Sequence, residues 1–291
     1  MKQFLFYILL LFFFTQCKQS SSGEPLKPVF ADTPVSVNIK AGIIDEASGI
    51  ADSRAVAGHL WVEQDSGNPP ELALLAYNGN LLKKIFIQGC NNRDWEDLAV
   101  AKGPDANAYY VYLADIGDNF LQYDNYYIYR FKEPTISTDT IRMFETLTFK
   151  YPDGSNNAEA IIVDNDLKDI YIITKSTVKT NVYKIAYPQT TAATMEARLI
   201  TSLPFKTVVA AGISADGREI VVKTYAEIYY WKRTGTQTIE DVLKTSPATL
   251  KYKLEIQGEA FCFKNDNTGF YTLSEKPAIS SAVDLNFYKR H

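Results

Sequence analysis

One short motif recurs along this chain at intervals of about fifty residues, a glutamate followed by an apolar run. It stands at residues 46–50 (EASGI), 96–100 (EDLAV), 159–163 (EAIIV) and 259–263 (EAFCF), and residues 211–214 (AGIS) repeat it without the acid. Polar turns and further strand-like runs follow each copy. A fixed period of this size indicates a repeat fold, in which each unit buries its apolar face against its neighbours.

Each repeat has the pattern of a small antiparallel sheet. Val, Ile, Tyr and Phe are frequent, and Asn78-Gly79 and Asp216-Gly217 are typical hairpin turns. We expect four strands in each of the first four units and three in the fifth, with one strand, Val35–Ile39, left over at the front. If that strand becomes the outer strand of the last unit, the ring closes without a long exposed edge. The sequence therefore predicts an all-β fold, a β-propeller of five four-stranded blades closed by an N-terminal strand.

The main alternative is a six-bladed propeller, with a degenerate blade in the long stretch between Phe131 and Asn157. A β-sandwich fits poorly, because sandwiches do not repeat every ~50 residues. Residues Ile239–Thr245 are expected to form one short helix inside a loop of the fourth unit.

The N-terminus resembles a bacterial lipoprotein signal. Phe4–Phe14 is wholly apolar but shorter than the roughly 20 residues that span a bilayer. Cys17 follows as the expected lipidation site, although Gln16 stands where a small residue is usual, and an ordinary secretory signal is the alternative. We divide the chain into a signal peptide (1–17), a flexible tether (18–28) and one propeller domain (29–291). The predicted location is the bacterial cell envelope, with the lipid anchor in the outer membrane.

Composition narrows the chemistry. The net charge of −4 gives no reason to expect nucleic acid as a partner. Two histidines argue against a Ser–His–Asp triad and against zinc. Besides Cys17 there are only Cys90 and Cys262, interpreted as a loop thiol and a core residue, and whether they pair is left open.

Chain geometry predicts one functional face. The start of the first strand of a blade and the end of its second strand lie on the same rim, so charged residues at both places should converge around the central channel. We expect the metal-ligating residues to be Glu46, Glu96, Glu159, Glu259 and Asp115. We expect the ligand-binding residues to be Asp65, Asn68, Asp94, Asp118, Asn119, Lys175, Lys223 and Glu275. The competing interpretation is structural, with acids that cap strands or pair with the two lysines.

Two loops favour calcium as the cofactor. Residues 65–68 (DSGN) and 115–119 (DIGDN) both follow a second strand and place a glycine among carboxylate and amide oxygens. Such a loop can fold around a hard cation, which takes six to eight oxygen ligands. The spacing is not that of an EF-hand, and a metal-free turn rich in Asp, Asn and Gly is the alternative.

Residues 46–51, 60–68, 94–99 and 157–161 resemble secreted propellers related to the SdiA-regulated and esterase-like phytase families. That resemblance implies a propeller with acidic residues at the centre of one face, often with calcium. Those relatives usually have six blades, so the count of five departs from them. No catalytic motif is matched, so the resemblance implies no activity residue by residue.

Two functions remain open from the sequence. The first is an exported lipoprotein that uses a calcium-binding acidic face to hold a small-molecule or protein ligand. The alternative is a metal-assisted hydrolase of phosphoesters, lactones or glycosides that uses the same face. Whether the chain is an enzyme is left undecided, because no nucleophile or acid–base pair is specified.

Overall fold

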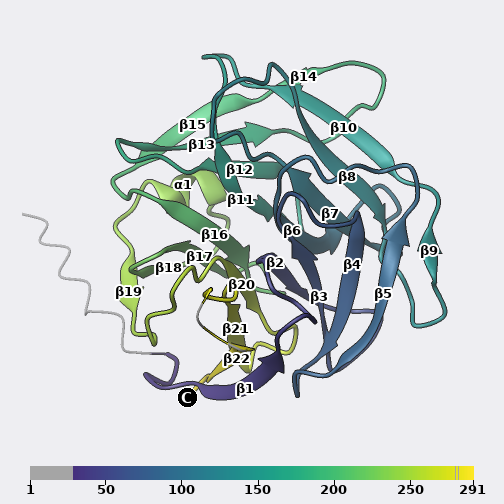
Figure 1. Cartoon of the computed structure of the whole chain (residues 1–291). Helices are drawn as coiled ribbons and strands as arrows, with labels where there is room; N and C mark the ends of the chain where they lie inside the picture. Colours follow the sequence, from purple (N-terminus) through teal and green to yellow (C-terminus); the bar gives the residue numbers. More distant parts are fainter. Residues whose placement is uncertain (1–28, 279, 281) are drawn as a thin grey trace, which may run out of the picture.

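The computed structural model describes residues 29–278, 280 and 282–291 (Figure 1). The predicted signal peptide with Cys17 and the tether 18–28 lie outside the described residues. The described strands form five sheets arranged as the blades of a β-propeller (Figure 1). Among these residues, none of the helices has the length and apolar character needed to cross a bilayer.

The strands follow the predicted repeat. Blade 1 contains β2 (Ala47–Asp52), β3 (His59–Gln64), β4 (Glu71–Ala76) and β5 (Leu81–Ile87). Blade 2 contains β6 (Trp95–Lys102), β7 (Tyr109–Asp115), β8 (Tyr126–Lys132) and β10 (Glu145–Lys150). Blade 3 contains β11 (Ala158–Val163), β12 (Ile170–Thr174), β13 (Thr180–Ile185) and β15 (Arg198–Leu203). Blade 4 contains β16 (Val208–Ile213), β17 (Glu219–Thr224), β18 (Ile228–Lys232) and β19 (Ala248–Leu250).

The fifth blade joins the two ends of the described chain. It contains β20 (Ala260–Phe263), β21 (Gly269–Leu273) and β22 (Ala282–Lys289), with β1 (Val35–Lys40) as its outer strand. β1 runs antiparallel to β22, from Val35 opposite Phe287 to Lys40 opposite Ala282 (Figure 1). The inner strand β20 contacts the inner strand β2 of the first blade, so the five blades form a complete ring.

Two short strands link neighbouring blades. β9 (Thr140–Ile141) pairs in parallel with β5 of the preceding blade, and β14 (Met195–Glu196) pairs in parallel with β10. Each belongs to the connection between the third and fourth strands of its own blade, which reaches back over the edge of the blade before it. The stretch considered for a sixth blade therefore holds β9 and β10. The apolar pattern predicts a strand at Arg142–Tyr151, and this is wrong in its first part, because residues 142–144 are not in a sheet and β10 begins at Glu145.

The sequence pattern also predicts a strand at Leu250–Ile256, which is wrong over most of its length, because β19 covers Ala248–Leu250 and residues 251–256 lie outside the sheet. A strand predicted at Gly212–Ser214 is present as β16, which begins four residues earlier. The helix α1 (Ile239–Leu243) is present, capped by Thr238 and buried through Ile239, Val242 and Leu243. The Thr238 side chain accepts a hydrogen bond from the Asp241 amide, and the Asp241 side chain accepts one from the Thr238 amide. This reciprocal capping stabilises even so short a helix.

The apolar core lies between blades rather than inside them. Separate clusters of buried side chains fill the interfaces of neighbouring blades. Phe30, which precedes β1, packs edge-on against Phe270 with ring centroids 4.9 Å apart and thereby joins the interface of blades 4 and 5. Cys90 and Cys262 are both free and buried. Cys90 lies in the loop after β5, as predicted, and its thiol is part of the core between blades 1 and 2.

Candidate functional site

A β-bulge at the start of the inner strand turns one side chain out of the ladder in each of four blades. In β6 the pairing with β7 skips Glu96, and in β11 the pairing with β12 skips Glu159. The corresponding bulged residues are Ser48 in β2 and Val209 in β16. A bulge re-aims its side chain, and in blades 2 and 3 that side chain is a glutamate.

The bulges correct the predicted alignment of the repeats. Gly49 of blade 1 is equivalent to Asp97 and Ala160, so Ser48 takes the place of Glu96, and Glu46 lies two residues earlier. Glu46 is exposed, and its carboxylate accepts a hydrogen bond from the Asn68 amide at 2.6 Å. Aligning the repeats by their sequence motif therefore placed Glu46 at the wrong position, because a bulge of one residue does not change the apolar pattern.

A second ring of side chains comes directly after the second strands. In blades 1 to 4 the residue that follows the second strand is Asp65, Ile116, Lys175 or Tyr225, and in blade 5 Glu275 comes two residues after the end of β21. Together with the bulge residues, this ring forms one end of the channel. We call this end the acidic mouth, defined by Glu63, Asp65, Asp94, Glu96, Glu159, Glu259 and Glu275.

Three carboxylates of the acidic mouth could hold one cation between them. Asp65, Asp94 and Glu96 each offer a ligand oxygen, and these oxygens lie within 4.8 Å of one another. Gly117 makes this approach possible, because a Cβ there would clash with carboxylate oxygens of both Glu96 and Asp94. Within residues 29–278, 280 and 282–291, none of the three acids forms an ion pair with a lysine or arginine.

Glu63 adds a fourth acid beneath the ring. Its side chain is fully buried, and neither carboxylate oxygen accepts a hydrogen bond of ordinary geometry from the described residues, although the Gly49 amide faces it. Burial, with Asp65, Asp97 and Glu259 nearby, raises the pKa of Glu63 well above its usual range. A buried carboxyl without a donor costs free energy unless it is protonated or meets a cation.

Glu96 and Glu159 lie close enough that each affects the ionisation of the other. Burial and the neighbouring Glu159 raise the pKa of Glu96 well above its usual range. Burial raises the pKa of Glu159 to about 7, even though Lys175 donates to it at 2.9 Å and acts in the opposite direction. Two acids in contact cannot both ionise without a counter-charge.

The same arrangement continues toward blade 5. Glu259 accepts a hydrogen bond from the Tyr225 hydroxyl and lies 3.8 Å from the Lys175 ammonium. Burial and the adjacent Glu259 raise the pKa of Glu275 to about 8. Lys175 is thus the ammonium that compensates Glu159 and Glu259, while Asp65, Asp94 and Glu96 have no comparable partner in the part of the chain that the structure describes.

Lys223 occupies the position in blade 4 that Glu63 occupies in blade 1. It is fully buried, its ammonium donates to the Gly258 carbonyl, and it lies 3.9 Å from Glu255. Burial lowers its pKa to about 8 despite the nearby acids. Because it is fully buried, Lys223 supplies a positive charge inside this end of the channel.

The remaining predicted residues stabilise the loops around the mouth. Asp115 lies 3.5 Å from the Arg93 guanidinium and accepts from the Tyr129 hydroxyl at 3.1 Å. Asp118 accepts from the backbone amides of Gln122 and Tyr123 at 2.9 and 3.0 Å.

Asn157 links this loop to the site. Its side-chain amide donates to Asn119 at 3.2 Å and to Glu159 at 3.1 Å, while its carbonyl accepts from the Asp118 amide. Sequence reasoning missed Asn157, Tyr225, Ser48 and Glu63 as contributors to the mouth. Only Asn157, in the motif that precedes Glu159, carried a visible signal.

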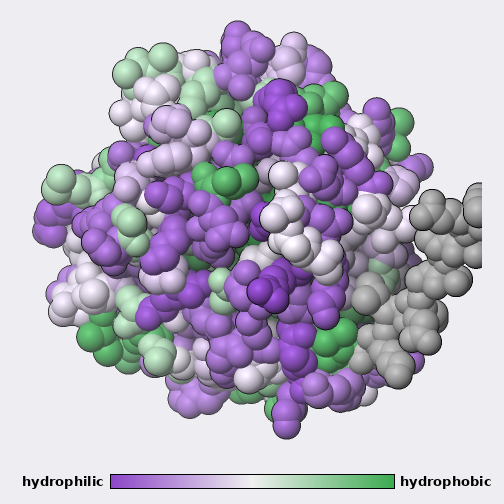
Figure 2. All heavy atoms as spheres, turned by 180° about the vertical axis from the view of Figure 1, so that it is seen from behind, coloured by the Kyte–Doolittle hydropathy of each residue, from purple (hydrophilic) through white to green (hydrophobic). Residues whose placement is uncertain are grey.

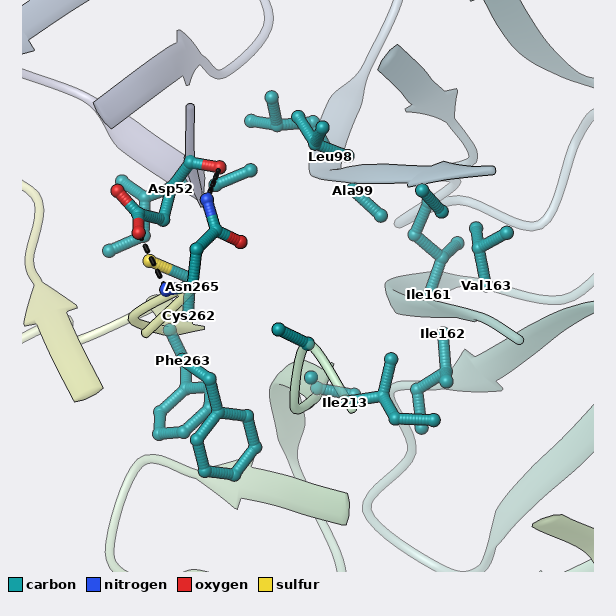
Figure 3. A pocket seen from close by; sticks show the side chains of 18 of the residues that line it. Asp52, Leu98, Ala99, Ile161, Ile162, Val163, Ile213, Cys262, Phe263 and Asn265 are labelled. Carbon is teal, nitrogen blue, oxygen red and sulfur yellow. Dashed lines mark hydrogen bonds between the residues drawn. The ribbon is translucent and has the colours of Figure 1, made fainter. Parts of the chain in front are cut away.

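Below the acidic mouth the channel is narrow and apolar. A cavity of about 60 Å³ remains among the inner strands, lined by residues such as Leu98, Ile162 and Ile213 (Figure 3). Asp52 and Asn265 lie at its far end and are hydrogen-bonded to each other (Figure 3). These apolar side chains separate the charged residues at the two ends of the channel.

No family model and no curated protein matches the chain. Among solved structures, similar ones include a nidogen/laminin complex (11% identity, TM-score 0.47, covering 79% of this chain and 72% of that one). Others are RRP9 WD40 repeats (9%, 0.43, 83% and 79%) and the Cps50 (Swd1) propeller domain of Myceliophteria thermophila (10%, 0.40, 84% and 82%). Since all these TM-scores lie below 0.5, the assignment as a propeller rests on the five sheets of this chain.

Proposed function

We propose that this protein is an exported β-propeller that binds calcium in its acidic mouth and uses that end of the channel to hold a ligand or partner. The observation that carries the proposal is the convergence of Asp65, Asp94 and Glu96 without a basic partner among the described residues. Oxygen ligands from carboxylates suit a hard divalent cation. Glu63 lies below the triad and accepts no hydrogen bond from the residues that the structure describes, which supports the same interpretation.

The cation would be held by this triad. Asp65 and Asp94 stand on loops above the strands, and Glu96 is held on its bulge by β6. When bound, calcium would offset the repulsion among these acids and leave coordination positions for a ligand oxygen. The carboxylate or hydroxyl groups of a ligand could then be recognised at this end of the ring.

A thermal melt with and without chelator tests the proposal. Calcium at about a hundredfold excess over its dissociation constant should stabilise the native state by ~2.7 kcal/mol. Glu96→Gln should reduce the rise in melting temperature, because it removes a ligand charge.

The control is Glu196→Gln, an exposed residue whose side chain retains 59% of its accessibility beside Lys150. Glu145 is unsuitable as a control, because it accepts a 2.7 Å hydrogen bond from the buried Arg130. If neither calcium nor chelator changes the melting curve, the proposed metal site is refuted.

A second candidate, metal-assisted hydrolysis, is favoured by the position of Glu159 in the acidic mouth, 3% exposed and 2.9 Å from the Lys175 ammonium, where burial raises its pKa to about 7. A carboxyl poised near neutral pH can accept or donate a proton during catalysis. Phosphoesters, lactones and glycosides are the substrates to screen. Turnover that survives Glu159→Gln would exclude this role.

The proposed location rests on the N-terminal sequence. If Cys17 is lipidated, palmitate label should follow the protein into the membrane fraction, and Cys17→Ala should release it. Export without incorporation of label would indicate a simple secretory signal instead.

A further inference from the structure

The end of the channel opposite the acidic mouth opens into a separate groove. It is lined by residues of blades 1 and 5 and by Tyr109 of blade 2, and it has a volume of about 530 Å³. Its wall includes the turn between β2 and β3, the turn between β20 and β21, and the side chains of Tyr77 and Tyr109. This volume is in the range of small-molecule sites, roughly 300–1,000 Å³.

Arg54 is the unmatched charge of this groove. Arg54 lines both the groove and the channel cavity. Of the arginines in the described part of the chain, it is the one that is not exposed and yet forms no ion pair with a carboxylate. Its Nε is buried and has no hydrogen-bond partner among the described residues.

The guanidinium is held in place by an aromatic ring. Its central carbon lies 4.3 Å from the centroid of Tyr109, and the closest contact of Nη1 with the Tyr109 hydroxyl is a long 3.5 Å. The ammonium of Lys102 lies 4.1 Å from the same centroid. Stacking orders an arginine without using its N–H groups, so these donors remain available.

The acids near Arg54 are already occupied by other donors. Asp52 accepts from the Tyr77 hydroxyl at 2.5 Å and from the Asn265 amide at 2.7 Å. Asp266 is paired with Lys264 and accepts from the Thr268 amide at 3.0 Å. Glu133, which is not part of the groove wall, accepts from the backbone amide of Arg54 at 2.9 Å. Among the described residues no carboxylate forms an ion pair with the Arg54 guanidinium, so its charge has no direct counter-ion in the groove.

We propose that this groove binds a small carboxylate ligand, with Arg54 holding the carboxylate and Tyr77 and Tyr109 lining the space for its body. The planar fork of a guanidinium matches a carboxylate through two parallel hydrogen bonds. Both tyrosines lie on the groove wall, which suits a flat or ring-shaped body. This site lies at the opposite end of the channel from the acidic mouth and does not require calcium.

Benzoate and its neutral analogue benzamide test the proposal in a protein-observed NMR titration with chelator present. Benzoate should bind saturably, with a dissociation constant of about 1 mM, and shift the amides of Ala57, Gly58 and Asn265. Benzamide should bind at least ~10-fold more weakly, because the charge-assisted hydrogen bonds are lost.

Variants separate the role of the guanidinium from that of the fold. Arg54→Met should weaken benzoate at least ~10-fold while keeping the wild-type spectrum elsewhere, and Arg54→Lys should retain part of the affinity. Arg218→Met removes an exposed arginine on another blade and should change nothing. Absence of saturable benzoate binding, equal binding of benzamide, or unchanged affinity in Arg54→Met would each overturn the proposal.

Discussion

The two ends of the channel belong to the same five repeats but treat buried charge in opposite ways. At the end beside Asp52, each acid meets a donor, as Asp52 meets Tyr77 and Asn265. At the acidic mouth there are more carboxylates than basic side chains to pair with them. Lys175 pairs with Glu159 and Glu259, which leaves Glu63, Asp65 and Asp94 without an ion pair among the described residues. Uncompensated charge in a stable fold is typical of a site that awaits a ligand of opposite sign.

The contrast originates in local backbone structure. Bulges at the strand starts turn Glu96 and Glu159 out of the ladder, so side chains from different blades are brought together. At the other end, hairpin turns supply amide donors such as Asn265, which bonds across to the backbone of Asp52 and Ser53. Figure 2 shows that one face of the ring is largely hydrophilic, with only scattered apolar residues.

The largest expected effect is on the stability of the whole ring, and so on both ends of the channel. Deleting the chain through Ile39 removes β1 and Phe30, exposes the edge of β22 and empties the sites of two buried side chains. We expect a loss on the order of 5 kcal/mol, comparable to the whole stability of a marginal domain. Deletion through Pro25 should cost little. Urea melts of the two truncations make the comparison, and equal stability would contradict the closing role of β1.

Loss of a single lysine should distinguish the two ends. Lys175→Met leaves Glu159, which is 3% exposed, without its partner, and should cost about 2 kcal/mol in chelator. Lys264→Met at the other end breaks a pair with the half-exposed Asp266 and should cost less than ~1 kcal/mol. Calcium should restore part of the loss only in Lys175→Met. Similar denaturation midpoints for both variants would remove the contrast.

A smaller effect is expected in the pH dependence of stability, which depends on the acids of the acidic mouth. The pKa values of Asp94, Glu159 and Glu275 are raised by burial to about 6, 7 and 8, above those of an unfolded chain. The native state then holds protons that the unfolded state has released, so stability is full below about pH 4 and falls as pH rises to about 8. Calcium binds the deprotonated acids and should flatten this fall. Melting temperatures measured across this range in chelator that rise with pH would contradict it.

The sequence predicted much of this architecture because the repeat is written in its apolar runs. Strand patterns, hairpin turns such as Asn78-Gly79 and the missing strand of the last unit define five blades. It could not show the bulges, because a skipped residue such as Ser48 changes pairing but not composition. Glu63 was hidden for a similar reason, since it looks like the polar end of an alternating strand and only the register points it at Gly49.

Partnerships across blades were equally invisible. The sequence placed Asp115 among the metal ligands, yet its carboxylate faces Arg93 and Tyr129. Lys175 and Glu259 lie far apart in the chain and are 3.8 Å apart in space. Which acid keeps a free charge depends on such contacts, and these follow from ring closure rather than from local pattern.

Isothermal titration calorimetry with calcium tests the central claim, that uncompensated charge at one end of the channel is a cation site. We predict one calcium per wild-type chain, binding at least ~10-fold weaker in Glu96→Gln, and unchanged binding in Asp52→Asn at the other end. No heat of binding in the wild type, or equal weakening by Glu96→Gln and Asp52→Asn, would contradict the assignment.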